Sequence, residues 1–293
     1  MLRLEQLSKT YSVGAFGGGR LQAVRDVSFD IRPGEVVSLI GESGSGKTTI
    51  GRMILRLVAP TAGHIWFDDA DVSTLHRHAL KEYYRRVQGV FQDPFSSYNP
   101  IFKIDRTFAM IRSGFFPGVD GRTWRAKLEA ALESVSLDPG GVLGKFPHQL
   151  SGGQLQRLLV ARALLLDIRY LVADEIISML DASTRIDVLN LLGELKARGL
   201  GIVFITHDLS LGNYISDTTV ILRHGCVVEM GATEKVFGDP RHPYTKSLLA
   251  SVAQLHAKWG PDEEEPALDG RPAPGEPAPE LVAVDDDHLA AAS

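Results

Sequence analysis

The sequence predicts an α/β fold with a parallel sheet, because strand-like and helix-like segments alternate along it. Short apolar runs, typical of strands buried on both faces, occupy residues 35–40, 170–173 and 201–205. Between the last two, residues 182–198 open on small polar residues and carry apolar residues near helical spacing. A strand, a helix and a strand in succession favour parallel pairing, with the helix covering the sheet.

Further segments on either side add strands and a helix. Residues 2–7 and 21–31 alternate apolar and polar side chains, as strands with one buried face do. The stretch Arg-Pro-Gly-Glu at 32–35 then predicts a turn. Residues 122–136 are typical of a surface helix, and the chain shows no internal repeat.

Composition excludes several classes of protein. Of 293 residues, 44% are hydrophobic and 23% are charged, as in ordinary soluble globular proteins. No apolar run approaches the ~20 residues of a membrane-spanning helix, and the first residues lack the apolar region of a signal peptide. The single cysteine, Cys226, excludes an internal disulfide and a cysteine metal cluster. We therefore expect a protein of the reducing cytoplasm.

Residues 256–293 are expected to form an acidic, proline-rich, disordered tail. From residue 261 onward the chain holds ten acidic side chains, one basic side chain and six of the fifteen prolines. Such a segment buries too little apolar surface to offset the entropy lost on ordering. A solvated tail without a specific role and a docking segment both remain open. The remaining residues have a small positive balance without a basic stripe, so no nucleic-acid partner is expected.

Residues 41–49, Gly-Glu-Ser-Gly-Ser-Gly-Lys-Thr-Thr, match the phosphate-binding (P-loop) pattern. The loop follows a buried strand and precedes a helical pattern, which is the context that the motif requires; a glycine-rich turn without a ligand is the alternative. We expect Lys47 to neutralise the β- and γ-phosphates of a nucleotide, Thr48 to ligate Mg²⁺ and Thr49 to support the loop. The loop residues assigned to nucleotide binding are Gly41, Glu42, Ser43, Gly44, Ser45 and Gly46.

Two carboxylates end the strand-like run Tyr-Leu-Val-Ala-Asp-Glu at 170–175. A phosphate-binding loop needs a carboxylate on a neighbouring buried strand to hold the magnesium ion. We expect Asp174 to hold Mg²⁺ through water and Glu175 to polarise the water that attacks the γ-phosphate.

Two more motifs indicate a family. Leu-Ser-Gly-Gly-Gln occupies 150–154 and opens a helical pattern, and Ile-Thr-His-Asp occupies 205–208. Together with the glycine loop, Val-Phe-Gln-Asp-Pro at 90–94 and Ser-Met-Leu-Asp at 178–181, the chain resembles the nucleotide-binding subunits of ATP-binding cassette (ABC) transporters over residues 2–254. The resemblance implies an ABC ATPase domain at 1–255, with a RecA-like P-loop NTPase core, an antiparallel β subdomain and an α-helical subdomain at about 93–157.

The resemblance also implies how two cassettes assemble. Two such subunits face head to tail, and each ATP lies between one glycine loop and the opposite Leu-Ser-Gly-Gly-Gln segment. That segment offers a hydroxyl and backbone N–H groups at a helix N-terminus, where anions bind. Closure is then driven by ATP and lost on hydrolysis. The residues implied are Ser151, Gly152, Gly153 and Gln154.

Four more positions match motifs of the family. Tyr11 matches the aromatic residue that stacks on adenine, with a core tyrosine as the alternative; a Gly-Ala-Phe-Gly-Gly-Gly insert follows it. Gln92 matches the glutamine that contacts Mg²⁺ and the attacking water. His207 matches the histidine that contacts the γ-phosphate and holds that water. Asp181 matches the aspartate that communicates across the dimer.

One stretch departs from the family pattern. Ile176 and Ile177 follow Glu175, where the family usually has a proline and a small polar residue. Isoleucine restores a backbone N–H that proline lacks and adds bulk beside the expected base. Both carboxylates remain, so we expect activity, and a repacked loop is the simplest alternative.

Residues 238–252, which include His-Pro-Tyr-Thr, resemble oligopeptide, dipeptide and nickel importer ATPases. The implied partners are two transmembrane permease subunits, a second ABC ATPase subunit (a paralogue or the same chain) and an extracytoplasmic solute-binding protein, at the cytoplasmic face of the inner membrane. Residues 94–102 are the expected wall of the groove for the permease, with a helical-subdomain core as the alternative. An iron–sulfur cluster is not expected, because Cys226 stands alone.

Other functions stay open beside peptide import. The same ATPase type serves oligosaccharide importers, such as those for cellobiose, and nickel importers. A non-transport ABC ATPase usually carries two cassettes or a long coiled coil, and this chain shows one cassette and no such insertion. A regulatory subunit with an inactive site is favoured only by Ile176 and Ile177.

Overall fold

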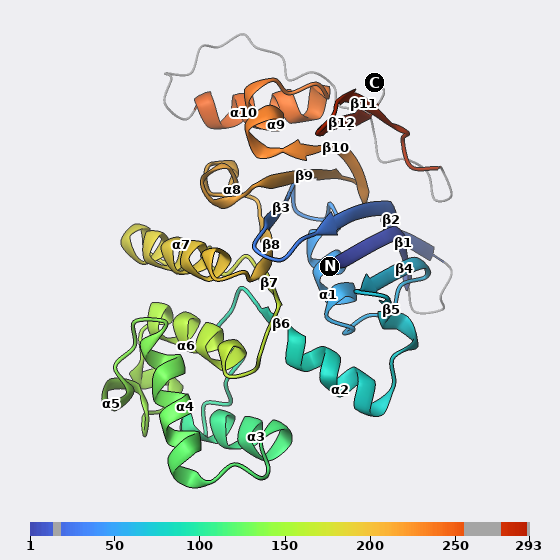
Figure 1. Cartoon of the computed structure of the whole chain (residues 1–293). Coiled ribbons are helices and arrows are strands. Elements are labelled where there is room, and N and C mark those ends of the chain that lie inside the picture. The colour runs from blue at the N-terminus through green and yellow to red at the C-terminus, as the bar shows by residue number, and fades with distance from the viewer. Residues whose placement is uncertain (14–18, 255–276, 292–293) are drawn as a thin grey trace.

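A computed structural model describes residues 1–13, 19–254 and 277–291, which form two β-sheets and a helical region (Figure 1). The larger sheet has the strand order β11-β12-β10-β9-β3-β8-β7-β6. Its strands are β3 (Val36–Ile40), β6 (Val87–Val90), β7 (Tyr170–Asp174), β8 (Gly201–Thr206), β9 (Thr218–Arg223), β10 (Cys226–Ala232), β11 (Leu281–Asp285) and β12 (His288–Ala291). The strands from β6 to β9 pair in parallel, and β10, β12 and β11 add antiparallel pairs. The predicted α/β class is confirmed.

The parallel strands are buried on both faces, as their continuous apolar runs predict. Because successive side chains of a strand point to opposite faces, Leu171 and Phe204 join one hydrophobic core while Val172 and Val203 join another. The first core lies against α6 (Gly152–Leu164) and α7 (Ala182–Ala197), and the second lies against α1 (Lys47–Ile54).

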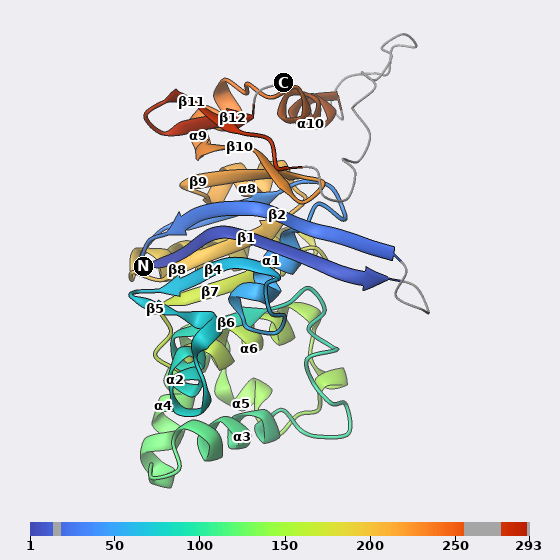
Figure 2. The same cartoon turned by 90° about the vertical axis from the view of Figure 1, so that its right-hand side faces the viewer.

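A smaller antiparallel sheet covers the α1 side of the larger one (Figure 2). Its strand order is β2-β1-β4-β5. The bounds are β1 (Leu2–Val13), β2 (Gly19–Ile31), β4 (Ala62–Phe67) and β5 (Ala70–Asp71). The alternating pattern places Leu2 and Leu4 in the second core, and a register shift between Leu4 and Leu7 places Leu7 there as well, which confirms the expected half-buried strand.

The chain between β5 and β7 is mostly helical, and its later part lies beyond the β6 edge of the larger sheet (Figure 1). The elements are η1 (Val72–Thr74), α2 (Arg77–Arg86), α3 (Asp105–Phe115), α4 (Gly121–Glu133), α5 (Pro139–Val142), η2 (Pro147–Gln149) and α6. The helix expected at 122–136 is α4; it begins where Asp120 caps two backbone N–H groups. Within the described ranges, no helix is long and apolar enough to cross a membrane.

The remaining helices are α8 (Leu209–Ile215), α9 (Thr233–Gly238) and α10 (Pro243–Gln254). The expectation of a disordered tail at 256–293 is wrong for residues 281–291, which form the hairpin of β11 and β12 on the edge of β10. The mean composition of the acidic, proline-rich stretch does not reveal the apolar residues near its end. These residues pair with β10, and the buried Glu229 of β10 contacts His288. Residues 255–276 and 292–293, and the insert except its last residue, Gly19, lie outside the described residues.

Candidate functional site

The glycine loop joins β3 to α1, as its motif predicts, and two of its glycines are required by close backbone approaches. A side chain at Gly41 would collide with the carbonyl oxygen of Leu222, and one at Gly46 would lie 2.5 Å from that of Ala23. Gly46 also has a φ of 104°, which favours glycine. The loop therefore packs closely against the backbone of β2 and of β9, and its last backbone N–H groups lie at the start of α1.

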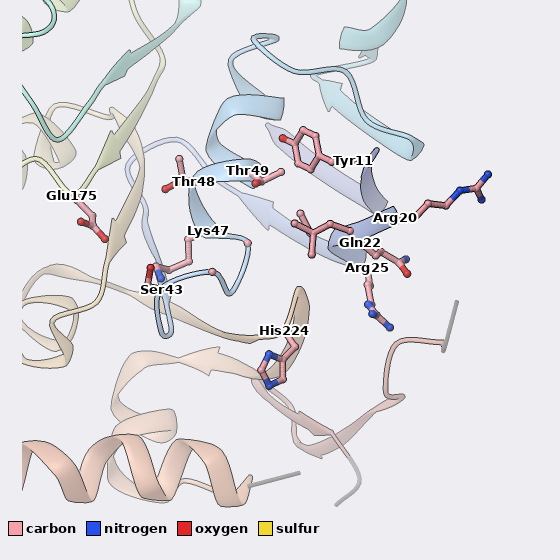
Figure 3. A pocket seen from close by; sticks show the side chains of 14 residues that line it. Tyr11, Arg20, Gln22, Arg25, Ser43, Lys47, Thr48, Thr49, Glu175 and His224 are labelled. Atoms are coloured by element: carbon pink, nitrogen blue, oxygen red, sulfur yellow. The ribbon is translucent and has the colours of Figure 1, made fainter. Parts of the chain in front are cut away.

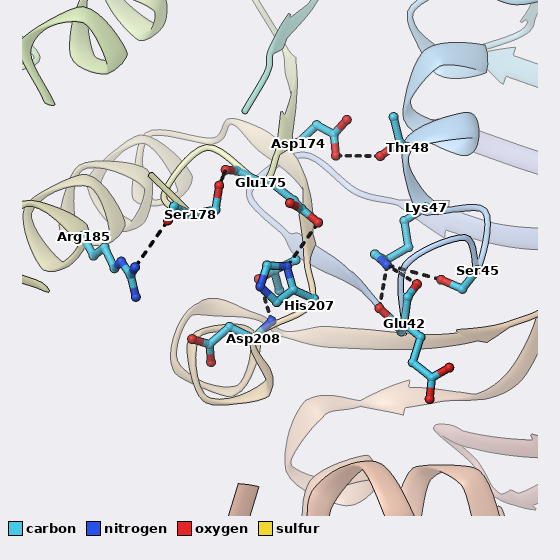
Figure 4. Close-up of polar contacts among 12 residues, drawn as sticks. Glu42, Ser45, Lys47, Thr48, Asp174, Glu175, Ser178, Arg185, His207 and Asp208 are labelled. Atoms are coloured by element: carbon cyan, nitrogen blue, oxygen red, sulfur yellow. Dashed lines mark hydrogen bonds and ion pairs between the residues drawn. The ribbon is translucent and has the colours of Figure 1, made fainter. Parts of the chain in front are cut away.

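Lys47 curls back over the loop from the first turn of α1 (Figure 4). Its Nζ donates hydrogen bonds to the carbonyl oxygens of Gly41 (2.5 Å) and Glu42 (2.8 Å) and to Oγ of Ser45 (3.3 Å). Burial lowers the pKa of Lys47, and the carboxylates of Glu175 and Asp174 oppose that shift. The ammonium is thus held inside the loop beside two acids, where it can neutralise a phosphate.

A cavity of about 560 Å³ opens beside the loop (Figure 3). This volume is within the ~300–1,000 Å³ typical of small-molecule sites. Eight residues assigned from the sequence line it: Tyr11, Ser43, Gly44, Gly46, Lys47, Thr48, Thr49 and Glu175. Tyr11 projects from β1 at one side, half-buried, with Nζ of Lys9 5.1 Å from its ring centroid. Its placement supports a binding surface over a core tyrosine.

Six lining residues were not anticipated from the sequence: Arg20, Leu21, Gln22, Ala23, Arg25 and His224. Five of them belong to β2, which pairs with β1 so that Leu21 lies opposite Tyr11 and Gln22 opposite Thr10. The sequence could have indicated these residues if residues 2–31 had been predicted to form a β-hairpin, because the second strand of a hairpin pairs with the first and would lie beside Tyr11. His224 follows β9 and has no motif of its own.

Thr48 and Asp174 form a candidate magnesium site. The Thr48 hydroxyl donates to Oδ1 of Asp174 across 3.1 Å, and Asp174 ends β7, the second strand along from β3. Burial raises the pKa of Asp174, while the bond from Thr48 opposes the shift. Mg²⁺ prefers oxygen ligands and is commonly held by one or two carboxylates plus phosphate oxygens. These oxygens fit that ion, although the described residues contain no cluster of three or more His, Cys, Asp or Glu side chains.

Glu175 and His207 meet at the carboxyl ends of two parallel strands. Oε1 of Glu175 lies 3.2 Å from Nδ1 of His207, and the backbone N–H of Glu175 donates to the carbonyl of Ile205 (2.9 Å). Glu175 has a φ of 50°, a conformation that few residues other than glycine adopt. Such departures concentrate at functional sites. The turn aims this carboxylate at the cavity it lines, while His207 remains exposed.

Gln92 and the segment 151–154 lie apart from this cavity. Gln92 is exposed just beyond β6 and does not line the cavity. Ser151 is exposed and caps α6: its Oγ accepts from the N–H of Gln154 (3.2 Å), whose Oε1 accepts from the N–H of Ser151 (2.9 Å). A Cβ on Gly153 would lie 2.5 Å from Cγ2 of Thr184, so this turn fits closely against α7. One chain does not bring Ser151 to its own cavity.

The segment after Glu175 is a tight turn on a hydrophobic base. Ile176 and Ile177 are buried in the core that also contains residues of α6 and α7, which agrees with a repacked loop. Asp181 ends the turn and caps α7, accepting from the N–H of Thr184 (2.9 Å) and from two hydroxyls. These hydrogen bonds lower the pKa of Asp181 to about 2.

Comparisons with known proteins identify related chains. The model of the ABC transporter family matches residues 24–178, and that of the oligopeptide/dipeptide transporter C-terminal region matches residues 228–275. A putative peptide import ATP-binding protein of Brucella ovis is 43% identical over 255 residues, which cover 86% of this chain and 78% of that protein. The oligopeptide transport ATP-binding protein OppF of Bacillus subtilis is 40% identical over 243 residues, 80% of this chain and 77% of the relative.

A solved structure has the same fold. The dimeric ATP-binding cassette MJ0796, in a post-hydrolysis state bound to ADP and Pi, is similar with a TM-score of 0.71 and 28% identity. The similarity covers 80% of this chain and 99% of that one.

Proposed function

The chain belongs to the ABC transporter family, and on that premise we propose that it is the ATP-hydrolysing subunit of an importer that takes up oligopeptides or dipeptides through a membrane permease. The observation that carries the proposal is that Lys47, Thr48 and Glu175 line one cavity and that Asp174 is hydrogen-bonded to Thr48 beside it. Lys47 and Thr48 come from α1, Asp174 is the last residue of β7, and Glu175 directly follows it. The peptide assignment is supported by the names of the relatives and by the matched C-terminal region.

ATP binding follows from the loop and the cavity. The backbone N–H groups at the start of α1 and the Lys47 ammonium bind the phosphates. Lys47 already spans the loop through Gly41 and Glu42, so it is positioned before the ligand arrives. Tyr11 provides the aromatic surface for adenine at the other side of the cavity.

In the proposed hydrolysis, Thr48 and Asp174 have one role, and Glu175 and His207 have another. Phosphoryl transfer depends mostly on positioning and on neutralising charge. Thr48 and Asp174 would hold Mg²⁺, which when bound supplies charge neutralisation at the phosphates. Glu175 orients and polarises the attacking water, and His207 holds that water and contacts the γ-phosphate. The contact between these two side chains holds His207 beside the carboxylate that lines the cavity.

The exposed position of Ser151 supports a working unit of two cassettes. Ser151, Gly152 and Gly153 do not line the chain's own cavity, and in the proposed dimer they complete the cavity of a partner cassette head to tail. Gln92 would join the site on closure, from its exposed position beyond β6. The partner is a second copy or a related ATPase.

Residues 94–102 would face the permease at the cytoplasmic side of the membrane. Phe95 is 50% exposed and Ile101 is 75% exposed, whereas Tyr98 belongs to the core. The segment thus has exposed apolar side chains that could contact the permease and one side chain that packs in the core. Two permease subunits and an extracytoplasmic solute-binding protein complete the proposed importer.

The test is purification through a tag on this chain from native membranes in mild detergent, with mass spectrometry of the partners. We expect two permeases, an ATPase partner and a binding protein. The Lys47→Ala variant is the matched control, since it should recover the same partners but lose ATP hydrolysis. Recovery from the soluble fraction with ribosomal or DNA-repair proteins would refute transport while leaving the ATP site standing.

Cargo is tested on the same complex reconstituted in liposomes with its binding protein. Labelled peptides and labelled cello-oligosaccharides are offered separately in the presence of ATP. Peptide uptake that Glu175→Gln abolishes supports the proposal, and uptake of the oligosaccharides alone refutes the peptide assignment.

A further inference from the structure

The C-terminal elements gather at the β10 edge of the larger sheet, and one of their side chains reaches the glycine loop (Figure 1). Tyr244, in the first turn of α10, is 1% exposed, and its hydroxyl accepts a hydrogen bond of 3.1 Å from the backbone N–H of Glu42. The carbonyl of the same Glu42 accepts from Nζ of Lys47. A single peptide residue therefore joins Tyr244 to the lysine at the candidate phosphate site.

Tyr244 is held rigidly for this contact. Its ring packs in a small core with Ile40, the last residue of β3, and with Val228 of β10. The Arg223 guanidinium lies over the ring, 5.1 Å from its centroid. Just before it, Nδ1 of His242 accepts from the N–H of Tyr244 (3.1 Å), and Pro243 takes the first helical position, which tolerates proline. The triplet His-Pro-Tyr thus starts α10 and aims the tyrosine hydroxyl at the loop.

A buried carboxylate fixes the segment in front of this triplet. Glu229 of β10 is 0% exposed and accepts from the backbone N–H groups of Arg241 (2.8 Å) and His242 (3.0 Å). Its third partner is Nε2 of His288, which is 2% exposed and lies 2.7 Å from Oε1. A buried carboxylate is costly unless it is paired and hydrogen-bonded, so His288 is part of what keeps Glu229, and through it residues 241–242, in place.

β10 is shaped to receive the hairpin that carries His288. A Cβ on Gly231 would collide with the carbonyl oxygen of Asp287 and lie 2.9 Å from Cα of His288. The strands pair in register at this point, with Gly231 opposite His288. On the outer side, Nζ of Lys235 lies 2.8 Å from Oδ1 of Asp285. Gly231 allows the close approach of the hairpin, and the buried Glu229 contacts His288. Together they indicate that β10 forms a specific docking site for the chain's own C-terminal hairpin.

We propose that Tyr244 is a positioning residue for Lys47, acting through Glu42, and that the β11–β12 hairpin secures it through the Glu229–His288 contact. The contacts run from the hairpin to Glu229, then to residues 241–244, then to Glu42 and Lys47. The inference rests on the ATP site of the proposed function and assigns to the His-Pro-Tyr element the task of holding the phosphate-binding loop in its binding conformation.

The test measures the dissociation constant for ATP with Mg²⁺ on the full chain by calorimetry. Tyr244→Phe removes only the hydroxyl, so the ring stays in its core. Because one hydrogen bond is lost, we expect the dissociation constant to rise about fivefold. The KM for ATP should rise alike, with kcat within about twofold of the wild type, since the reacting groups are untouched. Tyr214→Phe is the matched control, because that tyrosine is 61% exposed and bonds to Asn190 on another surface.

The hairpin is tested by Gly231→Ala, which collides only with hairpin atoms among the close contacts of that position. We expect a rise of the dissociation constant of about two- to fivefold, with no further rise when Gly231→Ala is added to Tyr244→Phe, because both changes act on one linkage. Gly193→Ala, where a Cβ meets nothing within 4 Å, is its control. Amide exchange at Glu42 should quicken in both test variants and in neither control.

Three results would overturn the inference. The first is an ATP affinity of Tyr244→Phe equal to that of Tyr214→Phe. The second is unchanged amide exchange at Glu42 in the two test variants. The third is full additivity of the two changes, which would detach the hairpin from Tyr244. Failure of the wild-type chain itself to bind ATP would overturn the proposed function and this inference together, so the two failures are distinguishable.

Discussion

Nδ1 of His207 lies 3.2 Å from Oε1 of Glu175, although the two residues follow different strands of the sheet. The contact is a consequence of parallel pairing, since β7 and β8 lie side by side with Asp174 opposite Ile205. Both strands therefore deliver their next polar residue to the same edge. The two side chains therefore lie close enough to contact one water molecule, as the roles proposed for Glu175 and His207 require.

The first prediction concerns Glu175→Gln. The amide keeps the size of the side chain and loses the ability to take a proton, so hydrolysis should fall roughly 10²- to 10³-fold while ATP binding persists. Steady-state phosphate release and nucleotide calorimetry check the two parts. Glu194→Gln, on the exposed face of α7, is the control and should keep full activity. Turnover near the wild-type rate in Glu175→Gln would remove this residue from the role of base.

The second prediction concerns Asp174 and pH. Burial raises the pKa of this carboxyl, so the folded chain without nucleotide binds its proton more tightly than the unfolded chain does. The stability that this group contributes is therefore present below its unfolded pKa of ~4 and is lost as pH rises through the folded value.

Asp174→Asn removes that loss because the amide stays neutral. In the absence of Mg²⁺ and nucleotide, we expect this variant to melt at a higher temperature than the wild type near neutral pH, with the difference shrinking as the pH is lowered. Hydrolysis should nevertheless be abolished. Thermal unfolding between about pH 5 and pH 8 measures this, with the exposed Asp187→Asn as control. A variant that melts below the wild type at neutral pH would contradict it.

The sequence predicts those parts of the site that follow local rules. Gly41–Thr49 directly follow the apolar strand β3 and Asp174 ends the apolar strand β7, so the local pattern was enough to predict their positions, whereas His207, which follows β8, was assigned through the family resemblance. Arg20, Gln22 and His224 reach the cavity through the pairing of β1 with β2 and the turn after β9. Their side chains carry no motif, so the sequence indicates Arg20 and Gln22 only through a predicted hairpin and does not indicate His224.

The hairpin at 281–291 shows that composition alone does not predict where a segment is ordered. Its residue His288 contacts Glu229 and Gly231, which lie more than fifty residues before it in the chain. The average composition of the acidic tail gives no information about a specific hydrogen-bond acceptor, Glu229, in another part of the chain. The isoleucines after Glu175 are a similar case, since their meaning depends on the core beneath them.

The third prediction tests that core. Ile177 is 2% exposed and Met179, two residues later in the same turn, is 61% exposed. Ile177→Ala should lower the free energy of unfolding by about 2–5 kcal/mol, because truncation of a buried side chain leaves a cavity, while Met179→Ala should change it by less than about 0.5 kcal/mol. Urea unfolding measures both. Equal effects would mean that the turn is not seated on the core as described.

The fourth prediction separates two roles of Asp181. This residue caps α7 through the N–H of Thr184 and, with its pKa lowered to about 2, is charged at neutral pH. Asparagine caps helices as well as aspartate does, and alanine does not. We therefore expect Asp181→Asn to melt with the wild type and Asp181→Ala to melt lower. If the charge communicates across a cassette dimer, both variants should hydrolyse ATP more slowly. Asp120→Ala, which removes the corresponding cap of α4, should lose stability and keep its activity per folded molecule. Full activity in Asp181→Asn beside a slow Asp181→Ala would reduce the part played by this aspartate to holding the end of a helix.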